Sequence, residues 1–223
     1  MTHPKLPDTC EGLRALITQA QVELGRLAQA QDPDIWTRIK GQEACKRAII
    51  VAAVQRHPML FVGPPKTSKS MLVQAATQLE VAATGICLPV DDIDNRKAWA
   101  ALLKKHKTAI AGAYIYSEVP AVPTRTLLNP QHGTTLARAL EHVASARNIV
   151  DTLPTDNPTS ILDENCKALL RQAMTELGIT AKSLNVILQV SLSIAALDGN
   201  PKVQVQHVAE AIQYAPERIR AGD

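Results

Sequence analysis

Apolar residues recur every three to four positions in two stretches near the start of the chain, residues 9–31 and 42–55. This spacing puts them on one side of a helix, so it predicts two amphipathic helices. Asp32-Pro33-Asp34 ends the first stretch and His57-Pro58 ends the second, because proline cannot continue a helix. The short apolar run at 59–62 predicts a buried strand.

The next part of the chain alternates between the two kinds of pattern. Residues 69–79 have helical spacing, 85–90 have the character of a strand, and 95–105 again predict a helix. The apolar run 108–116 is rich in strand-forming residues and predicts a third strand. Strands that alternate with helices favour an α/β fold with parallel strands.

The remainder of the chain is mainly helical in pattern. Residues 136–146 predict a helix, 148–153 a last short strand, and the polar, proline-containing stretch 152–160 a linker. Three amphipathic helices are expected after it, at 162–177, 183–197 and 205–215. We therefore expect an α/β core followed by an all-helical domain.

Composition narrows the class of protein. Of 223 residues, 46% are hydrophobic, which argues against wholesale disorder, and only 3% are aromatic, which indicates an aliphatic, helix-rich core. The net charge of +3 permits an anionic partner without requiring one. No apolar run approaches the roughly 20 residues needed to span a membrane, and no apolar signal follows the start, so a cytoplasmic protein without membrane contact is expected.

The four cysteines do not form a metal-binding pattern. Cys10, Cys45, Cys87 and Cys166 are widely separated and none belongs to a C-x-x-C pair. They are therefore expected to be reduced and mostly buried, as in a cytosolic protein.

The first predicted strand is followed by the sequence Gly-Pro-Pro-Lys-Thr-Ser-Lys-Ser. This matches the phosphate-binding loop pattern G-x-x-x-x-G-K-[ST], except that Ser68 stands where the second glycine belongs. In such loops backbone N–H groups converge on the phosphates, the lysine contacts them and the last hydroxyl ligates Mg²⁺. The candidate binding residues are Gly63, Pro64, Pro65, Lys66, Thr67, Ser68, Lys69 and Ser70.

Ser68 sets the main difficulty for this interpretation. If it must adopt a positive φ, a residue other than glycine costs on the order of 1 kcal/mol. The alternative is a proline-stiffened turn between strand and helix, with Lys66 and Lys69 solvated. That alternative does not explain why a strand, the spacing and a Lys-Ser pair coincide.

Several segments beyond the loop resemble one protein family. Residues 39–48, Ile-Lys-Gly-Gln-Glu-Ala-Cys-Lys-Arg-Ala, resemble the leading helix of AAA+ ATPases of the magnesium-chelatase subunit I family, which includes a competence-linked bacterial helicase branch. Residues 113–120 look like its Walker B strand. Its C-terminal domain is similar to segments 180–183, 193–199 and 207–214. The resemblance covers about residues 38–215.

This resemblance implies a parallel P-loop NTPase (AAA+) core at 37–156 and an all-helical lid domain at 157–223. The apolar pattern at 9–31 adds an N-terminal helical segment at 1–36. The resemblance further implies ATP and Mg²⁺ as cofactors, and assembly into a homo- or hetero-oligomeric ring with partner proteins. Ser70 and Ser117 would lie at the metal and Glu118 would orient the attacking water. Lys182 would sense the γ-phosphate, and Arg147 would serve as an arginine finger, with Arg138 as the alternative.

The chain departs from the family at positions that matter for hydrolysis. Ser117 replaces the usual Walker B aspartate and Lys182 replaces an arginine. A rival acidic pair, Asp91 and Asp92, also follows an apolar run, although these residues equally suit the start of a helix. We therefore expect an ATP-binding protein with weak hydrolysis. A non-hydrolysing scaffold or adaptor and a DNA-acting motor or loader are the alternatives.

Overall fold

The computed structural model describes residues 35–87, 104–128, 133–152 and 162–215. The predicted helix at 9–31, most of that at 95–105 and nearly all of the linker at 152–160 lie outside these ranges. Within them no helix is long and apolar enough to cross a membrane.

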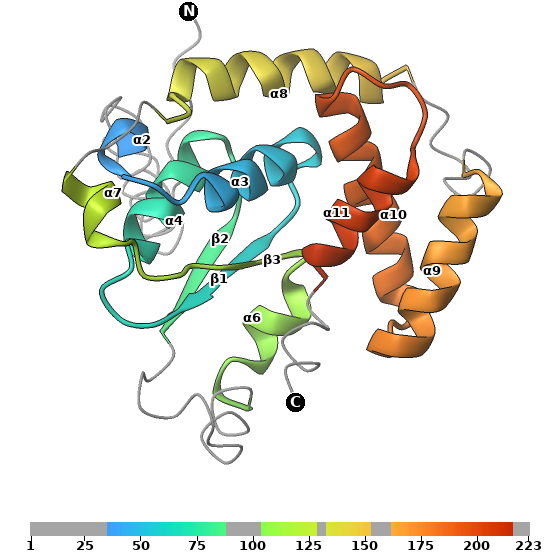
Figure 1. Cartoon of the computed structure of the whole chain (residues 1–223), viewed down its shortest axis with the longest axis horizontal. Helices are drawn as coiled ribbons and strands as arrows, with labels where there is room; N and C mark the ends of the chain where they lie inside the picture. Colours follow the sequence, from blue (N-terminus) through green and yellow to red (C-terminus); the bar gives the residue numbers. More distant parts are fainter. Residues whose placement is uncertain (1–34, 88–103, 129–132, 153–161, 216–223) are drawn as a thin grey trace, which may run out of the picture. The chain divides into compact units, whose positions relative to one another are not determined.

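Among the described residues, three parallel strands form a sheet: β1 (Met59–Gly63), β2 (Ala83–Cys87) and β3 (Ile115–Glu118). Their order is β2-β1-β3, so the first strand along the chain is central (Figure 1). Burial explains this placement, because all five residues of β1 are buried whereas β2 is partly exposed. The parallel α/β arrangement predicted from the sequence is confirmed.

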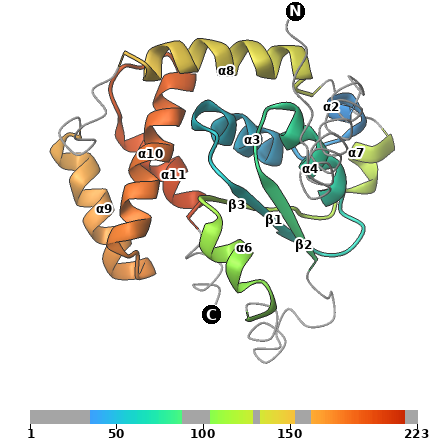
Figure 2. The same cartoon turned by 180° about the vertical axis from the view of Figure 1, so that it is seen from behind.

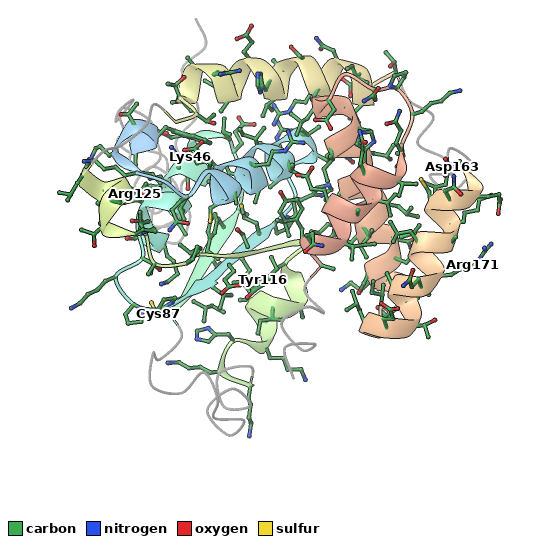
Figure 3. All side chains as sticks on the ribbon, in the orientation of Figure 1. Lys46, Cys87, Tyr116, Arg125, Asp163 and Arg171 are labelled. Atoms are coloured by element: carbon green, nitrogen blue, oxygen red, sulfur yellow. The ribbon has the colours of Figure 1, made fainter. Side chains whose placement is uncertain are left out.

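Helices cover both faces of this sheet (Figure 2). On one face, α3 (Glu43–Gln55) and α4 (Lys69–Gln78) pack with the short α2 (Ile35–Arg38) over Phe61 and Ile115. On the other, α6 (Lys107–Gly112) covers Leu60, Val62 and Ile86, and Tyr116 packs against the same cluster (Figure 3). Successive strand residues point to opposite faces, so each face receives every second residue.

The C-terminal helices are α8 (Leu136–Val150), α9 (Glu164–Leu177), α10 (Ala181–Leu197) and α11 (Val205–Gln213). Thr135, Asp163 and Thr180 cap the first three by accepting a hydrogen bond from a backbone N–H in the first turn. α10 packs against α11, α8 and α3, and its buried residues share one hydrophobic core with the sheet. The helical C-terminal region is thus confirmed, and it is continuous with the α/β core.

One predicted strand is partly wrong and another is wrong. The first half of the run 108–116 is the helix α6, and only Ile115 and Tyr116 belong to β3. Short apolar runs do not distinguish helix from strand, and the alanines here favour a helix. In place of the strand expected at 148–153, residues 148–152 form the last turn of α8 and the turn after it, because the apolar spacing of α8 continues through Ile149 and Val150. Residue 153 lies outside the described ranges.

An ion-pair cluster joins α3 to the C-terminal helices. The guanidinium of Arg47 donates to Glu210 Oε1 and Asp198 Oδ1, both at 3.1 Å, and the Tyr214 hydroxyl donates to the same Glu210 oxygen at 2.9 Å. The backbone N–H of Tyr116 in β3 also donates to the Tyr214 carbonyl at 2.8 Å. The helical region is therefore held to the core by polar as well as apolar contacts.

Replacing Arg47 with methionine will destabilise the protein by about 1–2 kcal/mol, since two carboxylates lose a half-buried partner. Urea unfolding monitored by circular dichroism will measure this. The matched control is Arg56→Met, which breaks the more exposed ion pair with Glu80 and should cost less than about 0.5 kcal/mol. Equal losses from the two substitutions would show that the cluster does not stabilise this junction.

Candidate functional site

The predicted phosphate-binding loop connects β1 to α4. β1 ends at Gly63 and α4 begins at Lys69, as the motif requires. A Cβ atom on Gly63 would lie 2.3 Å from the carbonyl oxygen of Val119, so only glycine fits beneath the neighbouring chain. This places the start of the loop at the carboxyl edge of the sheet, where parallel α/β folds bind ligands.

Two residues of the loop have left-handed backbone conformations. Lys66 has φ 65° and Ser68 has φ 51°, so the position of the missing glycine does have a positive φ. Each costs a residue with a side chain on the order of 1 kcal/mol. The chain thus keeps the backbone conformation of a glycine-rich loop without the glycines that adopt positive φ at no steric cost.

Lys69 is folded into the loop. Its side chain is buried, and its ammonium donates to the Thr67 hydroxyl at 3.0 Å and to the Pro64 carbonyl oxygen. The Thr67 hydroxyl donates to the same carbonyl at 2.8 Å. The loop therefore closes around its own lysine, and a bound phosphate would exchange these neutral acceptors for anionic ones. The sequence placed Thr67 in the loop but did not indicate this role.

No acidic residue occurs between positions 60 and 79, and the first turn of α4 contains none. The nearest that follows, Glu80, is paired with Arg56 at 2.8 Å. The loop therefore combines two lysines and the N-terminus of a helix, and no carboxylate lies near it in the sequence. This electrostatic arrangement suits phosphate groups.

The predicted Walker B residues lie on β3, which pairs directly with β1. Ser117 is buried and its hydroxyl lies 3.6 Å from the sulfur of Cys45 in α3. Glu118 is exposed, and strand alternation puts its side chain on the opposite face of the sheet, the face covered by α6. The rival pair Asp91 and Asp92 lies outside the described residues, beyond the end of β2.

Cys45 holds this strand end against α3. Its thiol donates to the Glu118 carbonyl at 3.3 Å, and burial raises the pKa of this thiol. The prediction that cysteines are mostly buried holds for Cys45 and Cys166, whereas Cys87 is exposed at the end of β2, beside Gly63 (Figure 3). Cys45 is thus a packing residue, and the sequence did not reveal its contact with Ser117.

The loop fits a nucleotide better than the surrounding side chains fit Mg²⁺. Ser70 is exposed in the first turn of α4 and could contribute a hydroxyl, but the hydroxyl of Ser117 faces Cys45. Mg²⁺ prefers carboxylate oxygens and water. Across the ranges that the structure describes, no group of three or more His, Cys, Asp or Glu residues is arranged to hold a metal ion.

Arg147 has a clear contact within its own chain. Its guanidinium donates to the carbonyl oxygens of Ala53 at 2.7 Å and Val54 at 3.3 Å, near the C-terminus of α3. Such a cation satisfies carbonyl groups that the end of a helix leaves unpaired. A finger role for Arg147 remains a prediction. The alternative, Arg138, is exposed in the first turn of α8.

Lys182 lies far from the loop of its own chain. Ser193 of α10 bonds Gln55 at the C-terminus of α3, next to the start of β1. Lys182 lies roughly three helical turns, or about 16 Å, before Ser193 along α10. This end of α10 lies on the α9 side of the molecule, away from the loop between β1 and α4 (Figure 1). The structure does not bring it to Lys69 within one chain.

Two family models match the chain. The model described as "Magnesium chelatase, subunit ChlI" matches residues 35–86, and that described as "Magnesium chelatase, subunit ChlI C-terminal" matches residues 154–215. Competence protein ComM of Haemophilus influenzae is 49% identical over 43 residues, which is 19% of this chain and 8% of ComM. The matched part thus spans less than a tenth of that relative. The two family matches lie in the regions where the sequence resembles the family, and the chain belongs to the magnesium chelatase subunit ChlI family of AAA+ proteins.

Proposed function

We propose that this protein binds ATP at residues 63–70 and hydrolyses it weakly, as a subunit of an oligomeric remodelling complex. The observation that carries the proposal is the buried Lys69 at the start of α4, enclosed by a loop whose residues adopt left-handed conformations at the glycine-like positions. Family membership supports ATP as the ligand, since AAA+ proteins use this nucleotide.

The polar groups around Lys69 explain how the loop would bind triphosphate. Its ammonium is held by Pro64 and Thr67, both neutral acceptors, so contact with a phosphate oxygen would replace a weaker hydrogen bond by a charge-assisted one. The N-terminus of α4 adds backbone N–H groups and a partial positive charge. Ordering of the loop is already largely achieved before the ligand arrives.

Weak hydrolysis is expected because the end of β3, next to the loop, lacks the usual Walker B aspartate. Ser117 is neutral and hydrogen-bonded to Cys45, so it adds no negative charge for a metal. Glu118 would have to act from the face of the sheet opposite to α4. Electrostatic stabilisation of the transferred phosphoryl group and a positioned water supply most of the rate in such enzymes, and both are incomplete here.

Oligomerisation would supply what one chain lacks. Lys182 lies in the first turn of α10, away from its own loop, so any contact between this side chain and a nucleotide would involve the loop of a neighbouring subunit. AAA+ proteins typically assemble in this way. The helical region would then act as a lid for a neighbour.

Thermal unfolding with and without ATP tests the proposal, because a ligand of the native state raises the melting temperature. ATP at millimolar concentration should stabilise the wild type and leave Lys69→Ala unchanged, since removing the ammonium should weaken binding about a hundredfold. Lys202→Ala, an exposed lysine in the α10–α11 connection, is the charge-matched control and should respond like the wild type. An ATPase assay of the same three proteins measures hydrolysis.

The Ser117–Cys45 contact also favours a second function, a scaffold that keeps the AAA+ shape without hydrolysis. ATP binding with no hydrolysis above the Lys69→Ala background would identify such a scaffold. If ATP shifts the melting temperature of neither the wild type nor the control, the nucleotide-binding proposal is wrong.

A further inference from the structure

Lys66 is a second lysine in the phosphate loop, and family-like loops have glycine at this position. It lies three residues before Lys69 and adopts φ 65°, a conformation that disfavours any side chain. Its side chain is exposed, and it forms no hydrogen bond or ion pair with the rest of the described chain. Lys69 differs, because its ammonium is buried and held by two loop oxygens. Lys66 is therefore the cation of the loop that is free to meet an incoming anion.

The charge of this site departs from the usual one in two compensating ways. A cation is added to the loop at Lys66. A carboxylate is missing from the end of β3, where Ser117 bonds Cys45. In a common phosphate-loop site, protein carboxylates hold Mg²⁺ and the metal neutralises the β- and γ-phosphates. Here the described residues provide one more positive charge for the phosphates and one fewer carboxylate to hold the metal.

We propose that the loop binds the triphosphate of ATP without requiring Mg²⁺, and that Lys66 supplies the positive charge that the metal otherwise provides. This inference rests on the proposed function, since it concerns the same loop. It also gives a physical reason for the strained lysine. A side chain in a left-handed conformation is tolerated where its ammonium contributes to binding.

The test measures ATP affinity by calorimetry in excess Mg²⁺ and in EDTA, with the wild type and Lys66→Gly. Glycine relieves the left-handed strain, so this variant is expected to fold at least as well as the wild type. The wild type should bind with nearly equal affinity in both buffers. Lys66→Gly should lose about ten- to a hundredfold in EDTA, the effect of one charge-assisted hydrogen bond, and regain most of it in Mg²⁺. Lys66→Arg, which keeps the charge, should behave like the wild type.

Three further results would decide against the inference, and they are distinguishable. Wild-type binding that depends on Lys69 but requires Mg²⁺ would overturn the inference and leave the proposed function standing. If the double substitution Asp91→Asn and Asp92→Asn then removes the gain in affinity that Mg²⁺ gives, those residues hold the metal. Absence of ATP binding in both buffers would overturn the proposed function together with the inference. Equal affinities of Lys66→Gly and wild type in EDTA would show that Lys66 does not replace the metal.

Discussion

Replacing Gly63 with alanine is expected to destabilise the protein by about 3 kcal/mol, the upper part of the range for inserting an atom into a well-packed interior. The added Cβ would lie 2.3 Å from the carbonyl oxygen of Val119. That carbonyl belongs to backbone immediately after β3, and the adjacent N–H of Val119 donates to Val62 at 2.7 Å, so it cannot move without breaking strand contacts. The substitution should therefore displace the strand end rather than a flexible side chain.

The measurement is the urea midpoint, with Gly85→Ala as the matched control. Gly85 is also a strand glycine, in the neighbouring β2, but a Cβ there would meet only side-chain atoms of Lys69 and Val73, at 3.5 and 3.8 Å. These are ordinary contacts, so the control should shift stability by less than about 0.5 kcal/mol. Similar midpoints for the two variants would contradict the close approach of Val119 to Gly63.

Acidification between pH 6.5 and about 4 is expected to cost the protein roughly 3 kcal/mol through His57. This imidazole is 4% exposed and stacks on Tyr114 with ring centroids 5.5 Å apart. Burial lowers the pKa of His57 to about 4. Between these pH values the unfolded state binds more protons than the folded state, so stability rises with pH across this window and is lost as pH falls. The buried His207 acts in the same direction, because burial lowers its pKa too.

Carboxylates also titrate in this range, so the readout is the difference between variants. His57→Phe keeps an aromatic ring against Tyr114 but does not titrate, and its free energy of unfolding should fall less steeply between pH 7 and 4.5 than that of the wild type. The control is His142→Phe, an exposed position on α8, which should retain the wild-type slope. Parallel slopes for all three proteins would show that the His57 ring is not neutral in the folded state.

Local patterns were enough to find most of the fold. The apolar spacing of α3, α4, α9, α10 and α11 predicts their existence within a few residues of their bounds. The phosphate loop was also located, since Gly63 is the last residue of β1 and Lys69 is the first residue of α4. The errors at 108–112 and 148–150 fall where apolar runs were too short, or too near the end of an element, for their spacing to distinguish helix from strand.

The roles of the site residues were less accessible. Ser117 and Glu118 follow a strand in the sequence as a Walker B pair would, yet one faces α3 and the other the α6 side. Arg147 looks free in the sequence, but its guanidinium satisfies carbonyl oxygens at the end of α3. Each outcome depends on a partner dozens of residues away, and no local pattern encodes such a partner.

By itself the sequence determined the family, the parallel α/β core, the helical C-terminal region and the position of the phosphate loop, because apolar spacing and short motifs are local properties. The tertiary structure alone decided the strand order β2-β1-β3, the enclosure of Lys69 by Pro64 and Thr67, and the position of Lys182 away from its own loop. These depend on which segments pair and pack across the chain, and hence on contacts between residues that are distant in sequence.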